Sequence, residues 1–239
     1  MLSLIGTAAT LWLALTGKLE LYIHPRYVPF TVSMALIAGA VSIAGFVMRQ
    51  EHVEDTHGHD NAGLPKTGRL RATGSLLIVT AAVLGLLILP PSPLTAEAAN
   101  QRDLNHSGTL SRHQTTDLLQ NNPGDFTVRD WASLLRYSPG DGYFANKTAT
   151  VTGFITADPK DALNVFYVTR FVVSCCTVDA QPVGVPVRQP GWQKQFKQGN
   201  WITATGGFGH NPNQDSPNAI LMTDPQITPT TEPQRPYLH

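Results

Sequence analysis

The feature that most constrains this chain is the concentration of long apolar runs between its start and Leu89. Residues 28–48 and residues 72–89 contain no charged side chain, and Pro90 ends the second run. A helix of about 20 residues, at a rise of about 1.5 Å each, covers the roughly 30 Å hydrocarbon core of a bilayer. Residues 1–16 form a third, shorter apolar stretch. We therefore expect residues 1–93 to be a membrane region with about three transmembrane helices.

The first apolar stretch is interpreted as a membrane helix and not as a secretory signal. It lacks the basic start and the clear small-residue cleavage site of a signal peptide. A start site upstream of Met1 would lengthen this helix. The alternative is that the apolar runs are buried helices of a soluble core.

Basic residues near the predicted helix ends indicate the orientation. The loop before the third helix carries four of them, Arg49, Lys66, Arg69 and Arg71. The loop before the second helix carries only two, Lys18 and Arg26. The more basic loop should be cytoplasmic, so we expect a multi-pass protein of the bacterial plasma membrane with its C-terminal part extracytoplasmic. The formal net charge of zero gives no sign of a nucleic-acid partner.

The remaining sequence predicts a polar tether and one exported domain. Residues 94–122 are rich in Pro, Ser, Thr, Asn and Gln, which is typical of a linker. The domain, residues 123–239, begins with a capping box formed by Thr127 and Asp130. That box starts a short amphipathic helix, which ends near Tyr137.

Alternating apolar and polar residues then predict five strands, separated by turns that contain Pro, Gly, Asn or Asp. The predicted strands are residues 148–155, 164–174, 182–187, 200–208 and 219–228. Five short strands with glycine at the bends fit a small OB-like β-barrel. A two-sheet β-sandwich is the alternative.

The only two cysteines, Cys175 and Cys176, are adjacent, at the end of an apolar run. A disulfide between neighbours is strained, because their Cα atoms lie only about 3.8 Å apart. In a regular strand the two side chains point to opposite faces, so joint binding of an ion requires the strand to end or bulge here. Thiolates favour zinc or copper, and Asp179 and His210 are candidate further ligands. Buried packing residues and a labile regulatory disulfide are the alternatives.

A second candidate metal site lies in the loop after the second predicted helix. His52, His57 and His59 stand beside three acidic residues within nine positions. Such a cluster is typical of a mobile metal-collecting loop. The alternative is an ordinary solvated loop on the cytoplasmic side.

A motif between the first two predicted helices suits the membrane interface. Tyr22 and Arg26 are residue types that anchor at the lipid headgroups, and Pro25 sets the turn. His24 could line a pathway with a partner, although an interface role is the simpler interpretation.

Several stretches resemble one family, the uncharacterised bacterial membrane proteins described as permease subunits. The resemblance rests on residues 15–19 and 22–26, on the Arg-Phe-Val-Val-Ser-Cys-Cys segment that begins at Arg170, on residues 182–187 and on residues 236–238. Members typically occur beside a larger multi-helix permease, and some are linked to zinc limitation. The resemblance implies an accessory subunit but no established mechanism.

Three hypotheses of function follow. In the first, the chain is a membrane-anchored accessory subunit that binds or gates a transition metal such as zinc for a multi-helix permease. In the second, it is a membrane-tethered thiol oxidoreductase, which requires an accessible cysteine with a depressed pKa. In the third, it is a scaffold without a ligand, and the cysteines only pack in its core.

Overall fold

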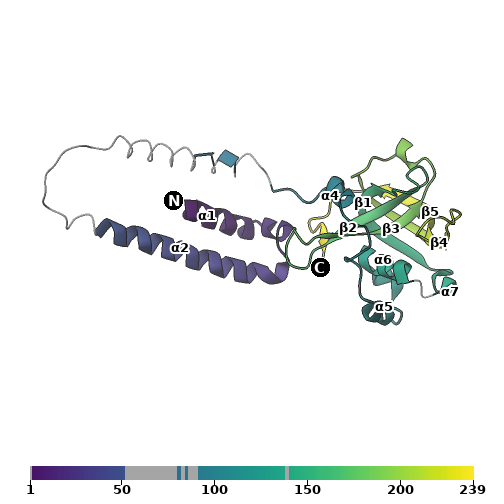
Figure 1. The fold of residues 1–239 in the computed structure, drawn as a ribbon, viewed down its shortest axis with the longest axis horizontal. Coiled ribbons are helices and arrows are strands. Elements are labelled where there is room, and N and C mark those ends of the chain that lie inside the picture. The colour runs from purple at the N-terminus through teal and green to yellow at the C-terminus, as the bar shows by residue number, and fades with distance from the viewer. Residues whose placement is uncertain (1, 52–79, 82–83, 86–90, 138–139) are drawn as a thin grey trace. The chain divides into compact units, whose positions relative to one another are not determined.

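The computed structural model describes residues 2–51, 80–81, 84–85, 91–137 and 140–239 (Figure 1). The chain divides into two compact units, Met1–Ser92 and Pro93–His239. The first unit is helical where it is described, and the second contains all the described strands.

The N-terminal unit is built around two apolar helices that lie side by side. Its described elements are α1 (Leu2–Leu15), η1 (Lys18–Leu21), η2 (Pro25–Tyr27) and α2 (Val28–Glu51). The Ser3 and Ser42 hydroxyls are hydrogen-bonded across the pair at 2.8 Å. Gly39 allows close approach, because a Cβ there would lie 3.2 Å from the Thr7 methyl group.

One described helix is long and apolar enough to cross a membrane, and it corresponds to the second predicted span. Large apolar side chains of α2 are exposed, including Phe30 at 64%, Val41 at 66% and Met48 at 68%. The helix α1 has only 14 residues, so at 1.5 Å per residue it is shorter than the hydrocarbon core. The prediction of three transmembrane helices is therefore not supported. The third, at residues 72–89, lies almost wholly outside the described residues.

The C-terminal unit begins with short helices, where the sequence predicted a tether. Its helices are α4 (Ala96–Asn100), α5 (Arg112–Leu118), η3 (Pro123–Asp125), α6 (Val128–Tyr137), α7 (Asp141–Phe144) and η4 (Trp192–Lys194). Ala96, Ala99 and Thr115 are buried, and Asn105 is hydrogen-bonded through its side chain to both backbone groups of Gly184. The stretch 94–122 is therefore packed onto the sheet domain, because its few apolar and amide side chains find partners far away in sequence.

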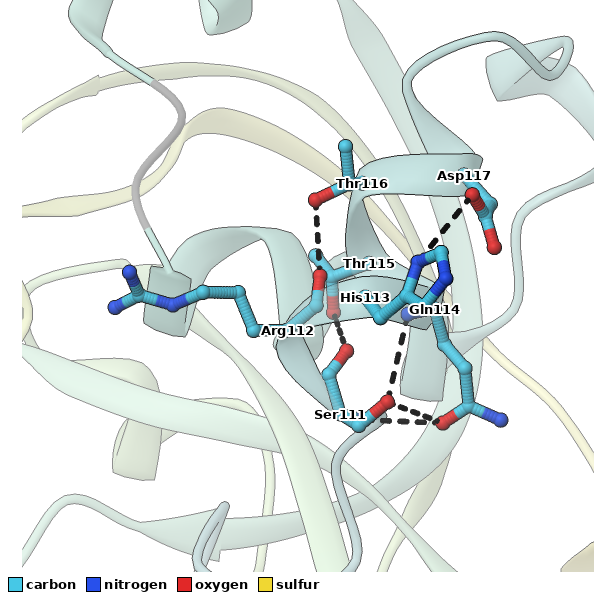
Figure 2. A network of polar contacts seen from close by, with 7 residues as sticks. All are labelled: Ser111, Arg112, His113, Gln114, Thr115, Thr116 and Asp117. Atoms are coloured by element: carbon cyan, nitrogen blue, oxygen red, sulfur yellow. Dashed lines mark hydrogen bonds and ion pairs between the residues drawn. The ribbon is translucent and has the colours of Figure 1, made fainter.

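Both α5 and α6 begin with capping boxes. The Ser111 hydroxyl accepts the Gln114 amide N–H at 3.4 Å, and the Gln114 side chain accepts the Ser111 amide N–H at 3.1 Å (Figure 2). At α6, the Asp130 carboxylate accepts the Thr127 amide at 2.8 Å, and the Thr127 hydroxyl accepts the Asp130 amide at 3.4 Å. The predicted box is confirmed, since these contacts satisfy amides that a helix start leaves unpaired.

The five predicted strands are present, and a sixth joins them in one mixed sheet. The strands are β1 (Thr148–Ala157), β2 (Val165–Val172), β3 (Gln181–Arg188), β4 (Trp201–His210), β5 (Ile220–Pro229) and β6 (Tyr237–Leu238). Their order is β1-β4-β5-β3-β2-β6, and β1 also pairs with β2. The five-strand prediction missed β6 because two residues carry no alternation. Two separate sheets, the sandwich alternative, are not found among the described strands.

The strand β1 exchanges partners along its length. Residues 148–154 pair with β4, and residues 154–157 pair with β2. Gly153 lies at this exchange, where a Cβ would collide with the Thr169 carbonyl oxygen. The missing side chain lets the two backbones approach closely at the point where β1 leaves β4.

The sheet domain has two apolar cores. The larger one lies between the sheet and α6, where Trp131 is fully buried and packs on Phe208 with ring centroids 4.9 Å apart. We call the smaller one the second core; it joins α4, the end of β2 and β6, and its buried residues are Ala96, Ala99, Phe154, Phe171, Val173, Ala180 and Tyr237. The second core is the base from which the cysteine-containing loop emerges.

Candidate functional site

The cysteine pair lies just beyond the end of a fully buried strand. Every residue of β2 is buried, and the strand ends at Val172. The following loop, residues 174–179, is called the thiol loop here. Cys175 is exposed and Cys176 is half-buried. The strand therefore ends before the two cysteines, which is the condition for both thiols to bind one ion. Since Cys175 is exposed, the two cysteines are not both buried packing residues.

The two thiols are free and belong to adjacent residues. A hydrogen bond to the Cys176 side chain and the charge of Cys176, with smaller effects of desolvation and Asp179, raise the pKa of the Cys175 thiol. Cys175 therefore remains protonated near neutral pH. Reactive cysteines of oxidoreductases have depressed pKa values, so this environment does not favour the thiol oxidoreductase hypothesis.

Asp179 closes the thiol loop. Its Oδ2 atom accepts the Cys175 amide N–H at 2.7 Å, and its Oδ1 atom accepts the Ser174 amide N–H at 3.3 Å. The Asp179 amide in turn donates to the Cys176 carbonyl at 3.0 Å. Both carboxylate oxygens are engaged inside the loop, so Asp179 fixes the backbone that presents the cysteines.

The residues on both sides of the thiol loop pack in the second core. Val173 and Ala180 are buried on either side of it. The Val173 amide donates to the Leu238 carbonyl at 2.9 Å. The Arg102 guanidinium donates to the Ala180 carbonyl, and it also lies over the Phe171 ring at 5.9 Å. The loop is therefore exposed at its tip and anchored at its base.

Arg170, five residues before Cys175, holds the C-terminal segment against β2. It is only 9% exposed and donates to the carbonyls of Pro236 and Arg235, each at 2.7 Å. It also lies over the Trp201 ring at 5.4 Å. Burial lowers its pKa, which the charge of Glu232 partly opposes. Sequence reasoning singled out the segment without finding this role, because the acceptors are more than 60 positions away.

The three C-terminal stretches that carry the family resemblance are neighbours in the sheet. The segment from Arg170 forms most of the second half of β2, residues 182–187 lie in β3, and residues 236–238 include β6. The strand β2 pairs with β3 on one side and with β6 on the other. These stretches therefore form one structural unit around the thiol loop.

Among the described residues, His210 does not join the cysteine pair in a metal site. His210 is the exposed last residue of β4, a strand that pairs with β1 and β5. Over the part of the chain that the structure describes, no three His, Cys, Asp or Glu side chains converge as a metal site. His52, His57 and His59 lie outside the described residues, so that cluster stays a prediction.

The predicted interface motif forms the turn between the two N-terminal helices. The His24 Nδ1 atom accepts the Arg26 amide N–H at 3.0 Å, which caps η2, and Pro25 begins that helix. Tyr22 is 38% exposed. His24 thus has a local structural role, and an interface role for the motif stays a prediction.

A buried polar cluster was missed by the sequence reasoning. Asp158 is 2% exposed and accepts the Lys160 amide at 2.7 Å. The Asn218 side chain donates to Asp158 and to the Tyr167 hydroxyl. Burial raises the pKa of Tyr167, so it stays protonated at all ordinary pH values. The cluster ties together loops at one end of the sheet, and the only sequence signal was a polar turn.

The described residues define a protein of two parts, a helical unit with one helix apolar and long enough to cross a membrane, and a mixed-sheet domain with an exposed thiol pair. Two family models match the chain: the DUF1980 N-terminal domain matches residues 1–105, and the DUF1980 C-terminal domain matches residues 131–239. No curated protein and no solved structure shows significant similarity to it.

Proposed function

We propose that this chain is a membrane-anchored accessory subunit of a multi-helix permease, and that its sheet domain binds or gates a transition metal through Cys175 and Cys176. The observation that carries the proposal is the pair of free, adjacent thiols on an exposed loop that is anchored at its base. Two thiols on a rigid support are a typical soft-metal chelate, for zinc or copper.

The incomplete set of ligands favours delivery over storage. Structural zinc sites have four protein ligands, whereas sites that exchange a ligand keep a position open. The thiol loop supplies two sulfur donors and leaves the tip exposed. A partner could therefore complete the coordination and receive the ion.

The permease and the location come from the sequence. The family resemblance implies a multi-helix permease partner, and the exposed apolar side chains of α2 suit contact with lipid or with membrane helices. The loop charges favour an extracytoplasmic position for the sheet domain, at a bacterial plasma membrane. A multi-pass topology is part of this proposal.

An OB-like barrel is the finer fold that we infer. The strand pairings run in a ring, β1-β4-β5-β3-β2 and back to β1, which supports closure of the sheet. Closure removes sheet edges, and β6 then extends β2 where β1 has left it. The thiol loop would project from the rim of this barrel.

Metal analysis tests the binding claim. The full-length chain, purified in detergent under reducing conditions, is expected to retain zinc or copper after dialysis. The variant Cys175→Ser/Cys176→Ser is expected to lose it. His210→Ala is the control and should retain the metal, because His210 is on a strand that does not pair with β2. Equal and negligible metal in both the wild type and the double variant would contradict binding.

Co-purification tests the partner claim separately. The tagged chain, extracted from its native membrane by a mild detergent, is expected to come out with a multi-helix permease. Recovery of the chain alone, with the metal still bound, would reject the subunit and keep the metal site. A complex that forms equally well with the double cysteine variant and transports normally would favour the scaffold hypothesis.

A further inference from the structure

Within the part of the chain that the structure describes, few donors are available to an ion on the thiol loop. The Asp179 carboxylate oxygens accept the amides of Ser174 and Cys175. The His239 ring lies nearby but faces the Val173 carbonyl oxygen, at 3.4 Å from Nδ1. Among the residues described, no third His, Cys, Asp or Glu joins the two cysteines. The described residues therefore present two sulfur atoms to an ion at this loop.

Metal ions differ in the number of ligands that they require, so they differ in how stably two sulfur donors bind them. Zinc in proteins is almost always tetrahedral and takes four ligands. Soft thiolate ligands select the cuprous ion, which has a filled d shell and is commonly stable between two thiolates in a near-linear arrangement. The donor set thus discriminates between the two metals that the sequence predicted together.

We propose that Cys175 and Cys176 bind one cuprous ion per chain through their two sulfur atoms, in preference to zinc and without a third ligand from the residues that the structure describes. The inference rests on the proposed metal-binding function and specifies its ion. It also explains the position of the pair, because an exposed two-coordinate ion is open to attack by an incoming ligand and can be transferred.

Binding is a ligand exchange without electron transfer. Two S–H bonds and the bonds from copper to its previous ligand, bicinchoninate in the titration below, break, and two copper–sulfur bonds form. The two protons and the previous ligand pass to the solvent. Copper enters and remains in the +1 state.

Competition titrations test this on the full-length chain in detergent, under oxygen-free conditions. Cuprous ion is buffered by bicinchoninate, and zinc by a chromophoric chelator. We expect one cuprous ion per chain, bound at least about 100-fold more tightly than zinc.

Cys175→Ser and Cys176→Ser should each weaken cuprous binding by about 100-fold or more, because one thiolate is lost from a site of two. X-ray absorption should show two sulfur neighbours. Far-UV circular dichroism checks that each variant folds, and His210→Ala is the control that keeps full affinity.

The outcomes separate this inference from the proposed function. Zinc bound as tightly as cuprous ion would overturn the preference and leave the metal-binding function standing. One ion shared by two chains, or a nitrogen neighbour, would overturn the two-sulfur site. Failure to bind either ion would overturn the inference and the metal part of the proposed function together.

Discussion

The two ends of one short segment, Arg170 and Cys175, have opposite environments. Arg170 is buried, and its guanidinium donates to three backbone carbonyls, those of Thr152, Arg235 and Pro236. Cys175 is exposed, and its neighbour in the thiol loop is the second free cysteine. One short sequence motif therefore contains both a buried residue that stabilises the fold, Arg170, and an exposed reactive residue, Cys175. The first holds the C-terminal segment in place, and the second remains available to a ligand.

The comparison predicts the largest loss of stability at Arg170. Arg170→Met should lower the free energy of unfolding by about 3 kcal/mol, because it leaves the buried Pro236 carbonyl and the partly buried Arg235 and Thr152 carbonyls without their donor. Thermal and urea unfolding of the full-length chain in detergent, followed by tryptophan fluorescence, measures this. Arg188→Met, at the exposed end of β3, is the control, and it should change stability by less than about 0.5 kcal/mol. Equal losses in both variants would show that Arg170 is not an anchor.

A second prediction concerns the backbone beside Arg170. Gly153→Ala should cost about 2 kcal/mol, because its Cβ would collide with the Thr169 carbonyl oxygen of the neighbouring strand. Gly207→Ala is the matched control in β4, where the nearest atom is 3.8 Å from the new Cβ. The same unfolding measurement applies. A stable Gly153→Ala variant would mean that β1 and β2 are not in close contact at this point.

The local features of the sheet domain could be predicted from the sequence. Alternation of side chains located the five longer strands, and the Thr127 and Asp130 pattern located the start of α6. The requirement that a strand end before Cys175 follows from the geometry of a strand alone. These features depend on neighbours within a few residues.

The features that were missed depend on distant partners. Nothing near Arg170 in sequence identifies the carbonyls of residues 235 and 236 as its acceptors. The stretch 94–122 looks like a linker because its packing requires Ala96 and Ala99 to meet Phe171 and Tyr237 in the second core. For the candidate site, the cysteines were identified from the sequence. The hydrogen bonds from the Ser174 and Cys175 amides to Asp179 were not, because a carboxylate near two thiols is as readily interpreted as a metal ligand as a group that closes a loop.

A third prediction tests how the anchored base supports the reactive tip. Asp179→Ala should lower the free energy of unfolding by about 1 kcal/mol, since two loop amides lose their acceptor. It should weaken metal binding by about tenfold, because the thiols are no longer held together before the ion arrives. Asp215→Ala, in the exposed loop between β4 and β5, is the control for both readouts. A complete loss of metal with unchanged stability would instead identify Asp179 as a ligand.

The smallest predicted effect lies within the thiol pair itself. Cys176 is the main cause of the raised pKa of Cys175, so Cys176→Ala should lower that pKa towards its ordinary value. More Cys175 is then thiolate at neutral pH, and the thiolate is the nucleophile. We expect iodoacetamide to modify Cys175 about two- to fivefold faster at pH 7 in the variant than in the wild type, with the rates converging at high pH. Peptide mass spectrometry identifies the modified residue, and Thr177→Ala is the control with an unchanged rate. A slower reaction in Cys176→Ala would mean that Cys176 activates its neighbour, which would revive the oxidoreductase hypothesis against the metal chelate.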